Sequence, residues 1–136
     1  MATPNNLSRE SLSYQIHTNR ELGMMLRCEK PLAVFAEIEH AFPQSLLRYL
    51  RMFDRHVQTG RFVKREHRVP IDVGERGVLL TVLYALPKEA WRIDEMIRLR
   101  HGMSDWTAEQ ERREGTLLGY SAQQNDAWIA SKSSTR

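Results

Sequence analysis

Residues 61–86 read RFVKREHRVPIDVGERGVLLTVLYAL, a stretch that decides the fold of this chain. Residues 78–86 are almost wholly apolar, which is typical of an inner strand covered on both faces. Residues 61–71 are more polar, and this composition suits a strand nearer the edge of a sheet. Gly74 and Gly77 lie between the two runs and can supply positive φ for a connecting loop. The stretch therefore predicts a β-hairpin over about 61–86.

The flanking segments show the periodicity of regular structure. Residues 32–38 carry an apolar side chain at every second position, which favours a strand. Residues 44–58 repeat apolar side chains every three or four positions, which predicts a helix. Further helices are predicted at 88–101 and 105–130, the last one broken near Gly119. The fold class is therefore α+β, with a small, mainly antiparallel sheet covered by helices.

Local signals predict how some helices begin and pack. Thr18 and Glu21 have the spacing of a capping box, which predicts a short helix from Asn19 to about Arg27. The tryptophans stand on predicted helices at core-compatible positions, and we expect core packing for all three of them: Trp91, Trp106 and Trp128.

Size and composition fit one globular domain over residues 1–136, with 41% apolar and 27% charged side chains. The polar ends, 1–12 and 131–136, are expected to be loose. The one cysteine, Cys28, excludes an intramolecular disulfide, and one thiol with scattered histidines makes no zinc ligand set. No apolar run approaches the length needed to cross a bilayer, so we expect a cytoplasmic protein with no membrane partner.

Positive charge is concentrated between residues 48 and 68. That stretch holds seven Lys and Arg against two Asp and Glu, whereas the whole chain holds 20 against 17. The remainder is slightly acidic, with 13 cationic and 15 acidic side chains. We predict that the stretch engages an acidic partner, either a nucleic-acid backbone or an acidic protein surface. The predicted partner-binding residues are Arg48, Arg51, Arg55, Arg61, Lys64, Arg65 and Arg68.

On a helix, Arg48, Arg51 and Arg55 fall within an arc of roughly 60° on the side opposite the apolar stripe. The alternative is an ordinary solvated face, in which Arg51 and Arg55 pair with Asp54 or with acids elsewhere. The net charge of +3 excludes a mimic of the DNA backbone, because such a mimic needs an acidic surface.

The sequence holds no nucleophile elbow, P-loop or dinucleotide fingerprint. This favours a non-enzymatic binding or regulatory module, and we expect no cofactor and no metal. A rival hypothesis is a small enzyme or metal-dependent protein that uses Glu37, Glu39 and His40. On a strand the two carboxylates project to the same side, and such a pair suits acid–base chemistry or a hard cation.

Residues 115–121 read GTLLGYS, and Trp128 follows them. This pattern resembles the helix-turn-helix family of DNA-binding proteins. Gly115 stands at the small position of the first helix, Gly119 in the turn, and Ser121 at the cap of the recognition helix.

The resemblance implies sequence-specific DNA binding by residues 115–130. Glu114 and Asn125 depart from the family pattern, which places buried aliphatic side chains there. The recognition helix would also carry Asp126 and no Arg or Lys before Lys132. The alternative is structural: two helices that close the domain.

Overall fold

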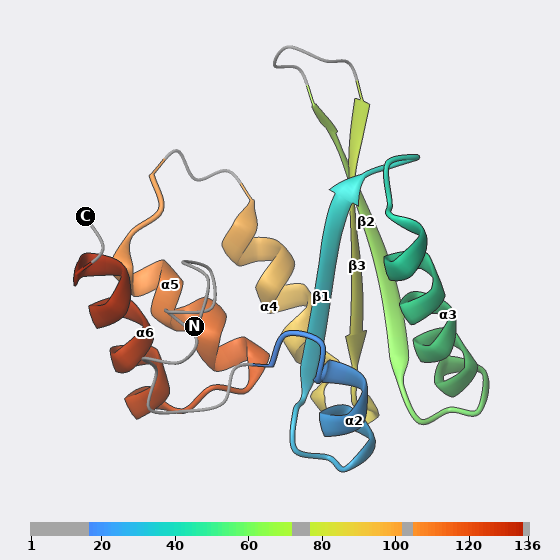
Figure 1. The fold of residues 1–136 in the computed structure, drawn as a ribbon, viewed down its shortest axis with the longest axis horizontal. Helices are drawn as coiled ribbons and strands as arrows, with labels where there is room; N and C mark the ends of the chain where they lie inside the picture. The colour runs from blue at the N-terminus through green and yellow to red at the C-terminus, as the bar shows by residue number, and fades with distance from the viewer. Residues whose placement is uncertain (1–16, 72–76, 102–104, 135–136) are drawn as a thin grey trace, which may run out of the picture.

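A computed structural model describes residues 17–71, 77–101 and 105–134. It shows a small single-domain α+β fold, as the sequence predicts (Figure 1). The elements, in chain order, are α2 (Glu21–Leu26), β1 (Leu32–Ile38), α3 (Gln44–Gln58), β2 (Val63–Ile71), β3 (Gly77–Ala85), the 3-10 helix η1 (Pro87–Glu89), α4 (Trp91–Arg100), α5 (Ala108–Leu118) and α6 (Ala122–Ser134). The expected loose end 1–12 and the expected loop glycine Gly74 lie outside the described residues.

Strand β3 lies at the centre of a sheet with the order β1-β3-β2, and both pairings are antiparallel. The β2–β3 register runs from Val63 opposite Ala85 to Ile71 opposite Gly77, which confirms the predicted hairpin. Gly77 begins β3 as a strand residue rather than as a loop residue with positive φ, which corrects one detail of that prediction.

Strand β2 begins two residues later than predicted. The amides of Arg61 and Phe62 both donate to the carbonyl oxygen of His56, at 2.9 and 3.2 Å. These two residues therefore belong to the turn that follows α3, and the ladder with β3 starts at Val63.

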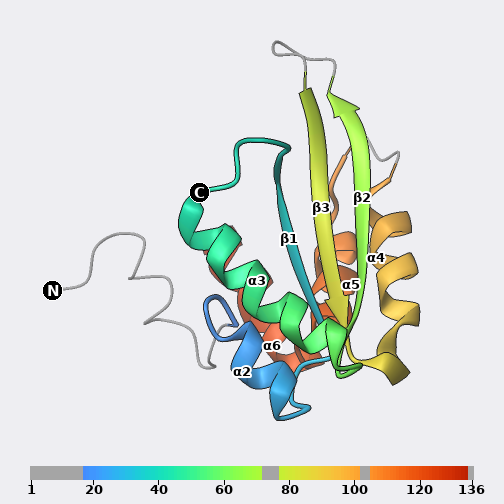
Figure 2. The ribbon, with the colours of Figure 1, turned by 90° about the vertical axis from the view of Figure 1, so that its right-hand side faces the viewer.

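The molecule has three layers. Helices α2 and α3 cover one face of the sheet, here called the α3 face, and α4 and α5 cover the other, here called the α4 face (Figures 1 and 2). Helix α6 packs on the outer side of α5. Each face has its own core: Phe53, Phe62, Val82, Tyr84 and Met25 on the α3 face, and Leu32, Leu83, Ile93, Met96 and Leu117 on the α4 face.

Helix α2 begins at Glu21, and the predicted capping box between Thr18 and Glu21 does not form. The hydroxyl of Tyr49, on α3, takes over this role. It accepts from the amide of Leu22 and donates to the Glu21 carboxylate, each at 3.0 Å. A tertiary contact therefore satisfies the free donor that a local cap was expected to satisfy.

The predicted core packing of the tryptophans is wrong for two of them. Trp91 is 48% exposed and lies under the guanidinium of Arg92, whose Cζ is 4.7 Å from the ring centre. Trp106 is also exposed and donates to Glu111. The buried face of α4 is instead formed by Ile93 and Met96, which leaves the Trp91 side of the helix to solvent.

The C-terminal helices follow the predicted break. Thr107 and Gln110 form a capping box at the start of α5, and Gly119 ends that helix with φ of 103°. Ser121 and Gln124 cap α6 reciprocally. Helix α6 continues to Ser134, into the stretch 131–136 that was expected to be loose.

A glycine at position 115 is required where α5 and α6 approach each other. A Cβ there would overlap Oδ1 of Asn125 and lie 2.9 Å from its Cγ. We expect Gly115→Ala to lower the free energy of unfolding by about 1–3 kcal/mol through overpacking, measured by urea denaturation. The control is Gly23→Ala in α2, where the new Cβ meets only the flexible Arg27 side chain, at 3.3 Å. Equal effects of the two substitutions would contradict the proposed close approach.

Candidate functional site

Three arginines form a row along the outer side of α3. Arg48, Arg51 and Arg55 are all exposed, and the opposite side of the helix buries Leu50 and Phe53. At 1.5 Å of rise per residue, the row extends over about 10 Å. We call these three residues the α3 arginine row.

Within the described part of the chain, no side-chain hydrogen bond or ion pair engages the α3 arginine row. Asp54, the neighbour expected to neutralise Arg51 and Arg55, is occupied elsewhere. Its Oδ1 accepts from the hydroxyl of Tyr84 at 2.7 Å and lies 2.9 Å from Nζ of Lys64. The guanidinium groups of the row therefore keep their charge available for a partner.

The other predicted cations already have partners on the protein. Nη2 of Arg61 lies 3.4 Å from the carbonyl oxygen of Leu26, and Lys64 pairs with Asp54. The remaining contacts are ion pairs of Lys64 with Glu66, of Arg68 with Glu39 and Glu66, and of Arg65 with Asp94.

The sheet also separates these strand cations. Lys64 and Arg68 stand opposite Tyr84 and Leu80 on the α3 face, whereas Arg65 stands opposite Leu83 on the α4 face. The structure therefore does not bring all seven predicted residues together on one surface. Among them, the α3 arginine row is the continuous group whose side chains have no partner in the described residues.

A shallow groove borders this row and adds apolar surface to it. Met52 is 46% exposed and follows Arg48 by one helical turn. The groove is lined by Asn19, Ser45, Leu46, Arg48, Tyr49 and Met52. The sequence could have indicated that Met52 is exposed, because this residue lies outside the apolar stripe of the helix.

Lys30 forms a buried polar cluster that no pattern in the sequence predicts. The residue is 2% exposed, and its Nζ donates to the carbonyl oxygen of Leu118 at 2.6 Å. The same Nζ lies 2.7 Å from Nδ1 of His17 and 5.7 Å from the ring centre of Tyr120. His17 stacks on Tyr120 with their centroids 3.8 Å apart. The cluster ties the start of the described chain to the turn after α5.

Burial governs the protonation of this cluster. It lowers the pKa of Lys30 to about 7, with the nearby Glu21 carboxylate acting in the opposite direction. Burial, together with the charge of Lys30, lowers the pKa of His17 to about 4. His17 is therefore a neutral acceptor at physiological pH.

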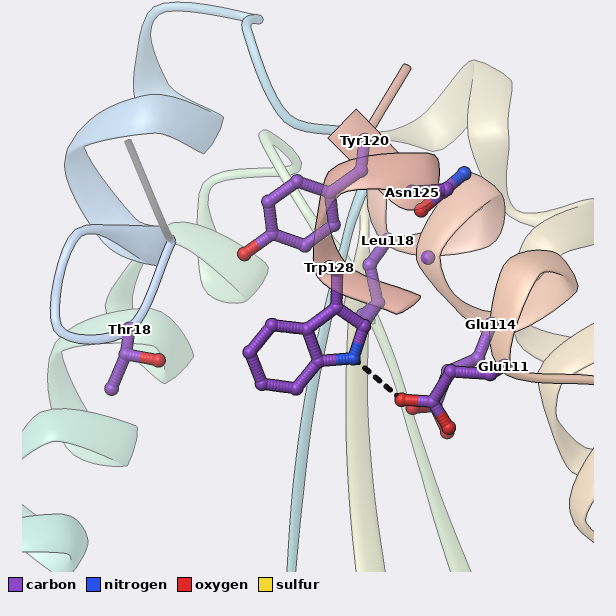
Figure 3. A pocket seen from close by; sticks show the side chains of 8 residues that line it. Thr18, Glu111, Glu114, Leu118, Tyr120, Asn125 and Trp128 are labelled. Carbon is purple, nitrogen blue, oxygen red and sulfur yellow. Dashed lines mark hydrogen bonds between the residues drawn. The ribbon is translucent and has the colours of Figure 1, made fainter. Parts of the chain in front are cut away.

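A pocket of about 210 Å³ lies between α5, α6 and Thr18 (Figure 3). Its carboxylates are already engaged: Glu111 accepts from Trp128 at 2.7 Å and from Lys132 at 3.1 Å, and Glu114 pairs with Arg100. Burial acts to raise the pKa of Glu111. Hydrogen bonds from Trp128, Trp106 and Lys132 together outweigh this effect, and the pKa is lowered. These contacts of Glu111 and Glu114 join α5 to α4 and α6. The two carboxylates therefore keep little uncompensated charge that could attract a ligand.

A three-residue turn, residues 119–121, joins α5 and α6, the two helices that carry the helix-turn-helix resemblance. Asn125, one of the departures from the family pattern, is 3% exposed and donates from Nδ2 to the Thr116 hydroxyl at 3.0 Å. On the proposed recognition helix, Asp126 pairs with Arg112 and Lys132 with Glu111. The outer side of α6 is therefore not basic.

The proposed cluster of Glu37, Glu39 and His40 does not gather as a ligand set in the described residues. Glu39 pairs with Arg68 at 2.9 Å, and in the residues with described placement no three His, Cys, Asp or Glu side chains gather as metal ligands.

Comparisons of the chain with protein-family models, with curated proteins and with solved structures found no match. Among the helices of the described ranges, none has the length and apolar character needed to span a bilayer.

The buried amine predicts a specific pH dependence of stability. The folded protein releases the Lys30 proton near pH 7, whereas the unfolded chain keeps it to about 10.5, so stability rises with pH between these values. We expect a rise of about 1 kcal/mol per pH unit above pH 7, measured from urea midpoints.

Lys30→Met should flatten this rise, because the titrating group is gone. The matched control is Lys88→Met, at an exposed position, which should retain it. An unchanged slope in the Lys30 variant would show that another group is responsible.

Proposed function

We propose that this protein is a non-enzymatic binding module that engages an acidic protein surface through the α3 arginine row and the groove beside it. The observation that supports the proposal is the lack of protein partners for Arg48, Arg51 and Arg55, within the described residues. A cytoplasmic location belongs to the same proposal, since the exposed thiol of Cys28 is suited to a reducing compartment.

An arginine row of this kind suits carboxylates. Each guanidinium presents several donors in a planar fork and stays charged at any physiological pH. Elsewhere in the described chain most arginines are held by acidic neighbours, as Arg27 is by Glu29 and Arg92 by Glu89. The row is therefore the surface where an acidic partner can form the most new ion pairs while breaking the fewest existing ones.

An acidic protein fits this surface better than a nucleic acid. Three phosphate contacts would give a salt slope of only about −2.7 on duplex DNA, and the rest of the chain is slightly acidic. The row is bordered by Leu46, Tyr49 and Met52, and protein interfaces are enriched in Arg, Met and aromatic side chains.

DNA binding by residues 115–130 is the second candidate, favoured by the turn at Gly119 and the close approach of Gly115 to Asn125. Its outer side offers the polar Gln123 but no unpaired cation to hold a phosphate. For this reason it is not our leading proposal.

Replacing the whole row tests the leading proposal. We expect the triple variant Arg48→Ser, Arg51→Ser, Arg55→Ser to weaken binding of the acidic partner by about 10- to 100-fold, since each interfacial charge contact contributes about 0.5–1 kcal/mol. The partner is first captured from a native extract and identified by mass spectrometry. Its affinity is then measured with purified proteins at low and high salt.

The matched control removes the same net charge from arginines that already have partners: Arg27→Ser, Arg98→Ser and Arg113→Ser. This control should retain the partner. Met52→Ser should also weaken binding although it changes no charge, because it removes apolar contact from the groove. If nuclease treatment abolished capture, the partner would be a nucleic acid and the proposal would be wrong. If both triple variants lost the partner equally, binding would depend on net charge and not on the row.

A further inference from the structure

A second groove lies on the α4 face of the sheet, on the side opposite the α3 arginine row. It has a volume of about 370 Å³, within the range of about 300–1,000 Å³ usual for small-molecule sites. Strands β2 and β3 form its floor and α4 forms its wall, and Figure 2 shows α4 alongside this face. Val69 stands opposite Leu79 in the register, and with Leu83 these side chains make the floor apolar. The wall contributes Met96.

Among the described residues that line this groove, every polar side chain can donate hydrogen bonds, and none of them is a carboxylate. Arg100 and His101 come from the end of α4, and His67 comes from β2. The rings of His67 and His101 lie 5.6 Å apart. An apolar floor edged by donors and cations is complementary to an anion that carries an apolar tail.

Thr81 gives an independent indication of a ligand. It is 7% exposed and stands directly opposite His67 in the β2–β3 register. In the part of the chain that the structure covers, its hydroxyl makes no hydrogen bond, yet no fully enclosed side-chain oxygen or nitrogen there lacks a partner. The hydroxyl is therefore accessible, and Thr81 is one of the residues that line the groove.

We propose that this groove binds a small amphipathic anion, a carboxylate with a short hydrocarbon tail. The carboxylate accepts from the Thr81 hydroxyl, from His67 and from Arg100, and the tail covers Leu79 and Leu83. This site is separate from the α3 surface, so its test does not depend on the proposed function.

Arg100 has donor capacity to spare for such a ligand. Its Nε and Nη2 both point to Oε2 of Glu114, at 3.3 and 3.2 Å, and Nη1 has no partner among the described residues. The end of α4 itself contributes roughly half a negative charge, so the anion depends on the cationic side chains to offset it. Glu114 competes with the ligand for Arg100.

Octanoate is the probe for this site, titrated into the full-length protein by isothermal titration calorimetry and by NMR of the histidine side chains. Octanamide has a similar tail without the charge, and acetate has the charge without the tail. We expect octanoate to bind at least about tenfold more tightly than either, with shifts of the His67 and His101 signals.

Two substitutions locate the site. Thr81→Val keeps the shape of the side chain and removes its hydroxyl, and it should weaken octanoate binding roughly tenfold, as expected for a hydrogen bond to a charged group. Glu114→Gln should strengthen binding, because it releases Arg100. A merely structural role of Glu114 would not produce that gain. The control is Arg27→Ser at the end of α2, on the opposite side of the sheet, which should leave binding unchanged.

Three results would overturn the proposal. Octanamide binding as tightly as octanoate would show an apolar groove with no anion site. Inorganic phosphate or acetate binding as tightly would show that the tail makes no contribution. Unchanged octanoate binding in both folded variants, Thr81→Val and Glu114→Gln, would place the ligand elsewhere.

Discussion

The central strand β3 is buried on both faces, and the positions of the other elements follow from this burial. Leu83 and Ala85 face α4 and α5, whereas Val82 and Tyr84 face α3. Full burial of a side chain such as Leu83 or Val82 contributes about 1.5–3 kcal/mol to stability, so both faces must be covered. Helices with an apolar stripe supply the cover, and their polar sides then point to solvent.

This arrangement explains why charge gathers where it does. The side of α3 that is not needed to cover the sheet carries the α3 arginine row, while Asp54 lies at the side of the helix and serves Tyr84 and Lys64. The two proposed sites lie on opposite faces of the sheet, at α3 and beside Thr81. A ligand at one does not obstruct the other.

The C-terminal helices are part of the same core rather than an appendage. Leu117 of α5 is fully buried on the α4 face, and Lys30 donates to the carbonyl oxygen of Leu118 at the end of that helix. The two helices that carry the helix-turn-helix resemblance therefore have a structural role in this protein. The same contacts bury Lys30, and this burial lowers the pKa of its amine.

The sequence alone determined the elements that depend on short-range pattern: the hairpin, the helix over 44–58, and the cap at Ser121. It also located the outward arginines, because helical periodicity fixes which side chains share a face. Only the tertiary structure decided which cations remain unpaired, because Asp54 of α3 finds its partners on the strands that this helix covers. Burial of Lys30 and the groove at Thr81 were likewise invisible, since both depend on segments that are distant in sequence and meet only on folding.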